Sequence, residues 1–268
     1  MVVHPIYESA LANGWHPPQG LLAKLTAYER QFFKNEFLGK RSKDYYKARL
    51  RKIGFEGKGA VLDLACGMGQ WTAAMSELNQ TVLGVDLNQS RLSFAESLLS
   101  FAGATNASFR VGAMETIPAE DNSFDAIFCY GSFMFSDMPI AMAELKRVAK
   151  PGAMVYLNAN AWGWYFHLVF DLGLARMNFA LTKTALRMIF RGLKEQKSQR
   201  PGQTQMLVTP QYICSLAEAS GFKVAQFGPE GSIGHKSVSV EPAYPKRYYG
   251  LVGIYEYLLE LEKKSGDS

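Results

Sequence analysis

Two carboxylates and two glycines stand where a nucleotide-type ligand could contact the backbone. The run DLACGMG, residues 63–69, follows an apolar segment and precedes a helical pattern. Gly67 and Gly69 remove side chains where a ligand must approach, and the helix that follows offers unpaired N–H groups. Asp86 stands 17 residues after Gly69 at the end of the next apolar segment, well placed to accept hydrogen bonds from two ribose hydroxyls. This spacing predicts a cofactor-binding loop.

The elements that must position this loop alternate along residues 58–160. Short apolar, β-rich runs predict strands, and the segments between them carry helical patterns. Helices are predicted at 90–101 and from Asp137 to the stop at Lys150-Pro151-Gly152. Strands are predicted at 60–65, 81–86, 108–113, 124–130 and 153–158. This alternation is typical of βαβ units and predicts an α/β fold with a mostly parallel sheet.

The remaining segments extend this core within a single domain that spans residues 1–268. Aromatic-rich helical patterns in 1–55 predict an N-terminal helical cap. The core is assigned to 56–160 and 206–262, and residues 161–205 are assigned to a helical insertion of two helices with a break near Gly173. In the second part of the core we expect a helix at 210–219, a strand at 222–227 and a last strand at 248–255.

Four motifs in this order resemble those of class I S-adenosylmethionine-dependent methyltransferases. They are VLDLACGMG at 61–69, GVD at 84–86, NSFD at 122–125 and LKRVAKPG at 145–152. The resemblance covers about residues 58–160, with a weaker stretch at 209–227. It implies a Rossmann-like, doubly wound and mostly parallel sheet of seven strands whose last strand is antiparallel. It also implies S-adenosylmethionine as cofactor and S-adenosylhomocysteine as product.

The resemblance assigns roles to particular residues of the cofactor site. Residues that correspond to the methionine-binding loop are Asp63, Ala65, Gly67 and Gly69, and Asp86 corresponds to the ribose ligand. Contacts to adenine are implied for Leu87, Ala113, Met114 and Glu115, and Cys129-Tyr130 corresponds to the strand end beneath the sulfonium.

Three positions depart from the family pattern. Ala65 replaces the first glycine of the loop, a mild change if the backbone angle there is ordinary. Ala113 replaces the usual acidic residue at the adenine edge, so that Glu115, a backbone carbonyl or water must meet the exocyclic amine. Many relatives carry a histidine shortly after the fourth strand, whereas this chain has SFMF at residues 132–135.

The expected function is methyl transfer to an oxygen, nitrogen or carbon atom of a small-molecule metabolite, by in-line displacement. Positioning of the acceptor supplies most of the acceleration in such a reaction, and a general base helps when the acceptor is a hydroxyl or a protonated amine. His235, His167 and His16 are the candidate bases, although each is also explained as an ordinary loop or packing residue.

Three other functions fit parts of the pattern. A Rossmann oxidoreductase also has a glycine loop and an acidic strand end, but the third glycine of the dinucleotide spacing is missing here. A non-catalytic S-adenosylmethionine-binding protein would keep the same loop. A nucleic-acid methyltransferase is disfavoured, because CYGS at 129–132 lacks the Asn/Asp-Pro-Pro-aromatic element of base-amino methylases.

A basic segment at residues 183–200 alternates cationic and apolar side chains. The plain interpretation is a solvated helix face over the core. The alternatives are attraction of an anionic substrate and peripheral contact with an anionic membrane surface, and both predict sensitivity to salt. The sequence does not predict an oligomeric state.

Composition limits the remaining possibilities. The chain has 268 residues, of which 48% are hydrophobic, and a net charge of +5. Its three cysteines, Cys66, Cys129 and Cys214, lack metal-type spacing and indicate a reducing, cytoplasmic setting without a metal site. The N-terminus does not resemble a secretory signal, and the longest apolar stretch, 161–174, is too short to span a bilayer.

Overall fold

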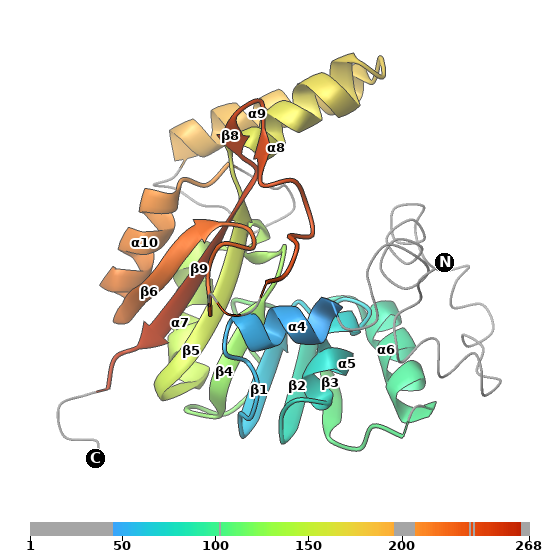
Figure 1. Cartoon of the computed structure of the whole chain (residues 1–268), viewed down its shortest axis with the longest axis vertical. Coiled ribbons are helices and arrows are strands. Elements are labelled where there is room, and N and C mark those ends of the chain that lie inside the picture. Colours follow the sequence, from blue (N-terminus) through green and yellow to red (C-terminus); the bar gives the residue numbers. More distant parts are fainter. Residues whose placement is uncertain (1–44, 102, 196–206, 236, 238, 264–268) are drawn as a thin grey trace.

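The computed structural model of the chain describes residues 45–101, 103–195, 207–235, 237 and 239–263 (Figure 1). Its centre is a seven-stranded sheet with the order β3-β2-β1-β4-β5-β9-β6. The strands are β1 (Ala60–Leu64), β2 (Thr81–Asp86), β3 (Ala107–Val111), β4 (Phe124–Cys129), β5 (Ala149–Asn160), β6 (Phe222–Pro229) and β9 (Ile254–Leu261). The helices around the sheet are α4 (Tyr45–Lys52), α5 (Gln70–Ser76), α6 (Gln89–Phe101), the short 3₁₀ helix η1 (Phe133–Phe135), α7 (Met138–Val148) and α10 (Pro210–Ala219).

The direction of the strands confirms the predicted fold class. The strands from β3 to β5 pair in parallel, whereas β9 is antiparallel to both of its neighbours, β5 and β6. The sheet is therefore Rossmann-like and mostly parallel, with an antiparallel last strand. The first four predicted strands lie close to their observed positions, and β5 is longer than expected at both ends.

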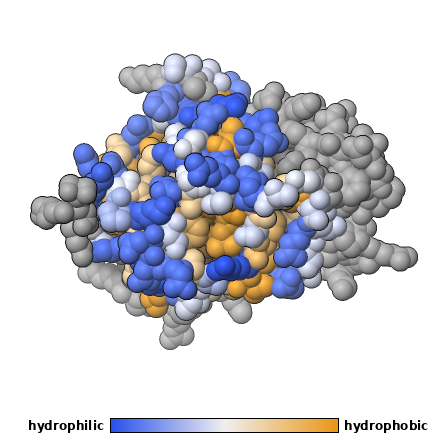
Figure 2. All heavy atoms as spheres, turned by 90° about the horizontal axis from the view of Figure 1, so that it is seen from below, coloured by the Kyte–Doolittle hydropathy of each residue, from blue (hydrophilic) through white to orange (hydrophobic). Residues whose placement is uncertain are grey.

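Both faces of the sheet are buried, because successive side chains of each central strand enter two different cores. On one face, Val61, Phe128 and Tyr156 pack with the side chains of α4 and α5. On the other, Leu62 and Ile127 pack with those of α7 and α10. Seen from below, hydrophobic side chains gather near the middle of the molecule and hydrophilic ones surround them (Figure 2).

The last strand does not occupy the predicted residues 248–255. That stretch instead forms the small hairpin of β7 (Arg247–Tyr248) and β8 (Leu251–Val252) and the start of β9. The turn between β7 and β8 contains Tyr249 and Gly250, which have φ angles of 51° and 76°. Two successive left-handed residues reverse the chain, so the long strand begins only after the hairpin.

The predicted helical insertion consists of α8 (Trp162–His167), the π-helical η2 (Leu168–Leu174) and α9 (Phe179–Glu195). The helix break lies near Gly173, as predicted, in the turn between η2 and α9, where Met177 has a φ of 53°. Gly173 is buried, and an added Cβ would lie 2.3 Å from Thr182 Oγ1. This glycine therefore permits the close packing of η2 against α9.

Most of the predicted N-terminal cap, residues 1–44, lies outside the described part of the chain. The cap is represented by α4, which packs beside α5 on the sheet. Among the described helices, none combines the length and the apolar character needed to cross a membrane.

Candidate functional site

The loop after β1 and the end of β2 are tied together by hydrogen bonds to one carboxylate. The backbone N–H of Gly67 donates to Asp86 Oδ2 at 2.9 Å, and the N–H of Asn88 donates to Asp86 Oδ1 at 2.8 Å. Gly67 has a φ of 58°, and an added Cβ there would meet no atom within 4 Å. The loop therefore presents open backbone beside a carboxylate whose orientation is fixed.

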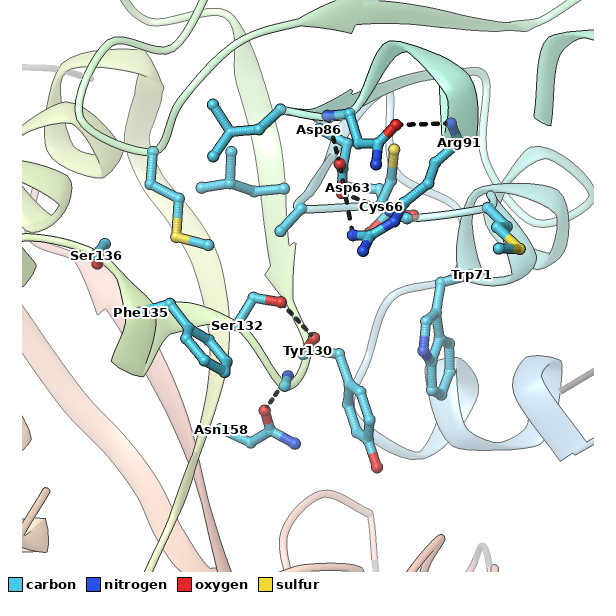
Figure 3. A pocket seen from close by; sticks show the side chains of 18 of the residues that line it. Asp63, Cys66, Trp71, Asp86, Arg91, Tyr130, Ser132, Phe135, Ser136 and Asn158 are labelled. Carbon is cyan, nitrogen blue, oxygen red and sulfur yellow. Dashed lines mark hydrogen bonds and ion pairs between the residues drawn. The ribbon is translucent and has the colours of Figure 1, made fainter. Parts of the chain in front are cut away.

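A cavity of about 880 Å³ runs from this loop toward the ends of β4 and β5. Figure 3 shows Asp63, Cys66, Asp86 and Arg91 at one end of it and Tyr130, Ser132, Phe135 and Asn158 at the other. The volume lies within the range of roughly 300–1,000 Å³ found for small-molecule sites. We call the two parts the loop end and the acceptor end.

Asp63 is the buried carboxylate of the loop end. It lies at the carboxyl side of β1, where Thr72 Oγ1 donates to its Oδ2 at 2.6 Å. Burial raises the pKa of Asp63 to about 7; nearby Asp86 adds to the shift, and the bonds from Thr72 oppose it. The charge of this side chain therefore changes near neutral pH.

The acceptor end combines aromatic rings with neutral hydrogen-bonding groups. The N–H of Gly131 donates to Asn158 Oδ1 at 2.5 Å, which leaves the Nδ2 of that amide as a donor beside the cavity. Trp71 also lines the cavity, and its buried Nε1 has no hydrogen-bond partner in the described part of the chain. A buried donor without a partner in a cavity wall is a position that a ligand can satisfy.

A buried ionic group lies directly behind the acceptor end. Tyr130, which lines the cavity, donates its hydroxyl to Glu230 Oε1 at 2.5 Å. Glu230 is 1% exposed and lies 3.8 Å from Arg49 Nη2, which also bonds to the buried Glu256. Burial lowers the pKa of Arg49, but Tyr156 and Glu256 outweigh it, so the net pKa is above the usual range.

Comparison with known proteins identifies the central part of the chain. Residues 61–152 match a family described as methyltransferase domain. A demethylmenaquinone methyltransferase of Shouchella clausii is 30% identical over 117 residues, covering 42% of this chain and 50% of that protein. An uncharacterized methyltransferase of Bacillus subtilis, YcgJ, is 37% identical over 91 residues, covering 34% and 36%.

A solved S-adenosylmethionine-dependent methyltransferase from Aquifex aeolicus superposes with a TM-score of 0.52 at 16% identity, over 89% of this chain and all of that one. Residues 61–152 therefore form a methyltransferase domain, and the chain has the fold of solved S-adenosylmethionine-dependent methyltransferases. The chain spans half or less of the length of these two curated relatives, so their substrates are not assigned to it.

The loop end fits the cofactor of the family. Asp86 has lone pairs left for a ribose, Gly67 leaves the approach to the backbone open, and the carboxylate of Asp63 suits a cationic ligand. Besides Tyr130 of the acceptor end, the residues assigned from the resemblance that line the cavity are Asp63, Ala65, Gly67, Asp86, Leu87, Met114 and Glu115. These residues would hold S-adenosylmethionine in the methyltransferase.

Three of the assigned residues are not among those that line the cavity. At Gly69, with a φ of 80°, an added Cβ would lie 2.8 Å from the Cβ of Ala95, so this glycine permits packing against α6. Cys129 is fully buried, and burial raises the pKa of its thiol. Ala113 lies between the lining residues Gly112 and Met114. Direct contact of these three with the cofactor stays a prediction.

Ala65 has a left-handed backbone conformation, with a φ of 60°. The replacement of glycine by alanine is therefore not made at an ordinary backbone angle. An alanine in this region is less stable than glycine by roughly 1–2 kcal/mol, so the surrounding loop must hold it in place.

Neither His167 nor His235, the two candidate histidines in the described part of the chain, lines the cavity. His167 Nδ1 lies 2.6 Å from Asp171 Oδ2, and its ring stacks on Tyr248 within the insertion. His235 is exposed, and its backbone N–H donates to the carbonyl of Lys52 at 2.7 Å. His16 lies outside the described residues. Among the residues that the structure does describe, no cluster of His, Cys, Asp and Glu could hold a metal ion.

Sequence reasoning missed Asn158 and Tyr244 of the acceptor end and Glu230 behind it. Asn158 lies at the carboxyl end of β5, beside Tyr130 at the end of β4, on the edge where ligands bind in open α/β sheets, so strand position could have found it. Glu230 carries no such signal, because its place depends on the packing of β6 beside β9.

Proposed function

We propose that this methyltransferase transfers the methyl group of S-adenosylmethionine to an oxygen, nitrogen or carbon atom of a small, neutral and partly apolar molecule. The observation that carries the proposal is one continuous cavity with two chemically different ends. The loop end holds the residues that match the family's cofactor site, and the acceptor end is lined by aromatic, amide and hydroxyl groups.

The protein's contribution to this reaction is mainly positioning. Bound S-adenosylmethionine supplies a methyl group on a sulfonium, which needs no further activation. Asp63, the 65–67 backbone and Asp86 fix the donor, while Asn158 and the rings of Trp164 and Tyr244 orient the acceptor and exclude water. Holding two reactants in line supplies about 7–11 kcal/mol of the barrier.

The lining favours a neutral acceptor over an anionic one. Arg91 is the only Lys or Arg that lines the cavity in the described part of the chain, and its Nη1 lies 3.8 Å from Asp86 at the loop end. The acceptor end is instead lined by the side chains of Ile254 and Phe135 and by the tryptophan rings. An aromatic, hydrogen-bonding compound fits this lining, and demethylmenaquinone, named in the relative from Shouchella clausii, belongs to that chemical class.

Tyr130 and Glu230 are the proposed route for a proton that leaves the acceptor. A hydroxyl at the acceptor end can donate to Tyr130 Oη while Tyr130 donates to the buried carboxylate of Glu230. As the methyl carbon bonds to the acceptor oxygen and its bond to sulfur breaks, leaving S-adenosylhomocysteine, that oxygen would become strongly acidic, so its proton would pass to Tyr130 Oη and the original proton of Tyr130 to Glu230. A carboxylate is a sufficient base for such an acidic oxygen.

Calorimetric titration with S-adenosylmethionine is the direct test of the cofactor site. We expect binding by the wild type and a loss of at least about tenfold in affinity for Asp86→Ala, because the ribose loses its charged acceptor. Release of S-adenosylhomocysteine is then screened with short-chain demethylmenaquinone, phenols and amines. Absence of binding at millimolar cofactor would refute the proposal.

Glu230→Gln tests the proton route. Glutamine keeps the hydrogen bond to Tyr130 but accepts no proton, so kcat for a hydroxyl acceptor should fall by about 10²–10⁴ while cofactor affinity stays unchanged. The matched control is Glu77→Gln, an exposed glutamate that pairs with Lys47 away from the cavity. Unaltered kcat in Glu230→Gln, with cofactor still bound, would exclude this role.

A further inference from the structure

The helical insertion exposes an unusual share of apolar surface. In the described part of the chain, 14 large hydrophobic residues are exposed, and seven of them lie between residues 170 and 193. The most exposed of these seven are Met177 at 77%, Phe179 at 68% and Phe190 at 68%. Three of the other seven, Leu87, Phe135 and Ile140, line the cavity and have a role there. The insertion therefore needs an explanation that the methyl-transfer site does not supply.

The apolar residues of α9 form a continuous stripe on its outer side. Phe179, Leu186, Phe190 and Leu193 are spaced by seven, four and three residues, which places them on one line along a helix. We call these four residues the apolar stripe. The face that packs against the protein is different and consists of Ala185, Ile189 and Gly192, which are all buried. The apolar sector of α9 is thus wider than the core requires.

A row of cations follows the stripe on the side away from the core. Lys183, Arg187 and Lys194 are exposed and lie four and seven residues apart, next to the stripe. Between residues 170 and 194 the sequence has five Lys or Arg and one acidic residue, Asp171. Asp171 bonds to His167 and Tyr249. The charge of this surface is therefore strongly positive.

The location of α9 separates these cations from the methyl acceptor. Figure 1 shows α8, α9 and β8 together at the top of the view, at one end of the molecule. None of the cations of α9 lines the cavity, although Trp164 of the neighbouring α8 does. The basic face therefore does not serve an anionic substrate, but its partner would lie close to the acceptor end.

We infer that the outer face of α9 is a docking surface for an anionic membrane. An exposed apolar stripe flanked by Lys and Arg is the arrangement that places a helix in the plane of a lipid interface, with apolar side chains among the acyl chains and cations at the headgroups. The turn at Leu174 and Met177 carries two more exposed apolar side chains toward the same end. Docking there would bring the acceptor end close to lipid, where partly apolar substrates dissolve.

Flotation of the full-length protein with lipid vesicles tests this inference. We expect binding to phosphatidylcholine vesicles that contain roughly one-third phosphatidylserine, weak binding to pure phosphatidylcholine, and release by salt. Phe190→Ser/Leu193→Ser should weaken binding at least about tenfold through the lost apolar insertion. Lys183→Gln/Arg187→Gln should weaken it by a similar factor and reduce its dependence on salt.

Controls come from exposed residues outside the insertion. Lys146→Gln/Lys223→Gln removes two exposed cations elsewhere and Phe227→Ser removes an exposed aromatic of β6, so neither should change vesicle binding. Thermal unfolding shows that each variant folds, and cofactor titration reports the methyl-transfer proposal separately. Equal binding of all variants, or no binding to anionic vesicles, would overturn the inference. A stripe variant that changes the molecular mass in light scattering, without vesicle binding by the wild type, would identify a subunit interface instead.

Discussion

At the scale of single residues, Asp63 has a charge that opposes the stability of the free protein. Its folded pKa of about 7 lies above the ordinary value of 3.8, so the folded state holds a proton that the unfolded state has lost between these pH values. Stability therefore falls as pH rises from about 4 to about 7. The same charge favours the binding of a cationic cofactor.

Asp63→Asn should accordingly raise the free energy of unfolding above neutral pH, by up to about 4 kcal/mol without cofactor. The variant should also bind S-adenosylmethionine more weakly. Urea unfolding at several pH values measures the first effect, and calorimetry measures the second.

Asp125→Asn is the control of opposite sign. Despite some burial, the N–H of Ala60 and the ammonium of Lys150 lower the pKa of Asp125, so its contribution to stability is present at neutral pH and is lost in acid. If the free energy of unfolding of Asp63→Asn equals that of the wild type at every pH, the assigned pKa of Asp63 is wrong.

The two ends of the cavity differ in how far the sequence predicts them. The loop end comes mostly from one short segment, residues 63–69, and from the neighbouring strand end at Asp86, so local spacing is enough to identify it. The acceptor end joins Tyr130 to Glu230, 100 residues later in the chain. No local pattern reports such a pairing.

At the scale of secondary structure elements, turns explain where prediction failed. The periodicity of the parallel strands is strong, and their positions are confirmed. The last strand was predicted too early in the chain, because Tyr249 and Gly250, both left-handed, form a hairpin turn within an apolar run. The helix break near Gly173 is confirmed, although the turn itself is made around Met177, because Gly173 is needed for close packing.

Gly192 is expected to determine how α9 sits on the protein. An added Cβ would lie 2.3 Å from the backbone carbonyl oxygen of Leu207 and 2.8 Å from its Cβ. Gly192→Ala should therefore lower the free energy of unfolding by about 1–3 kcal/mol, although alanine favours helices. Hydrogen exchange of α9 should rise in parallel.

Ala180→Gly provides the comparison on the same helix. Ala180 is exposed, so this change should cost only the helix propensity of roughly 1 kcal/mol. Increased stability of Gly192→Ala would show that the segment around Leu207 moves away without cost, contrary to the packing described.

At the scale of the whole molecule, the buried ionic group joins three distant parts of the chain. Arg49 belongs to α4, Glu230 follows β6, and Glu256 belongs to β9. Tyr156 of β5 and the N–H of Gly231 also donate to Glu256, at 2.7 and 2.8 Å. The position of α4 on the sheet and the placement of Glu230 behind the cavity therefore depend on the same guanidinium.

Arg49→Met should lower the free energy of unfolding by about 3–5 kcal/mol, because two buried glutamates lose their cation. Adding Glu256→Gln should recover part of this loss, which a double-mutant cycle measures. Arg51→Met is the control: Arg51 pairs with Glu56 at the surface, so the change should cost at most about 1 kcal/mol. If Arg49→Met and Arg51→Met lower the free energy of unfolding by similar amounts, the buried ionic group does not hold α4 on the sheet.

The position of β9 between β5 and β6 also bears on how the protein is made. A ribosome delivers the chain from its N-terminus, and domains generally begin to fold in that order. All strands beside the cofactor loop have emerged once residue 160 is outside the tunnel. Glu230 and Tyr244 are still to be translated then, and β5 lacks one neighbour until residue 261 appears. The residues of the loop end thus leave the ribosome well before the chain possesses a place for the molecule to be methylated.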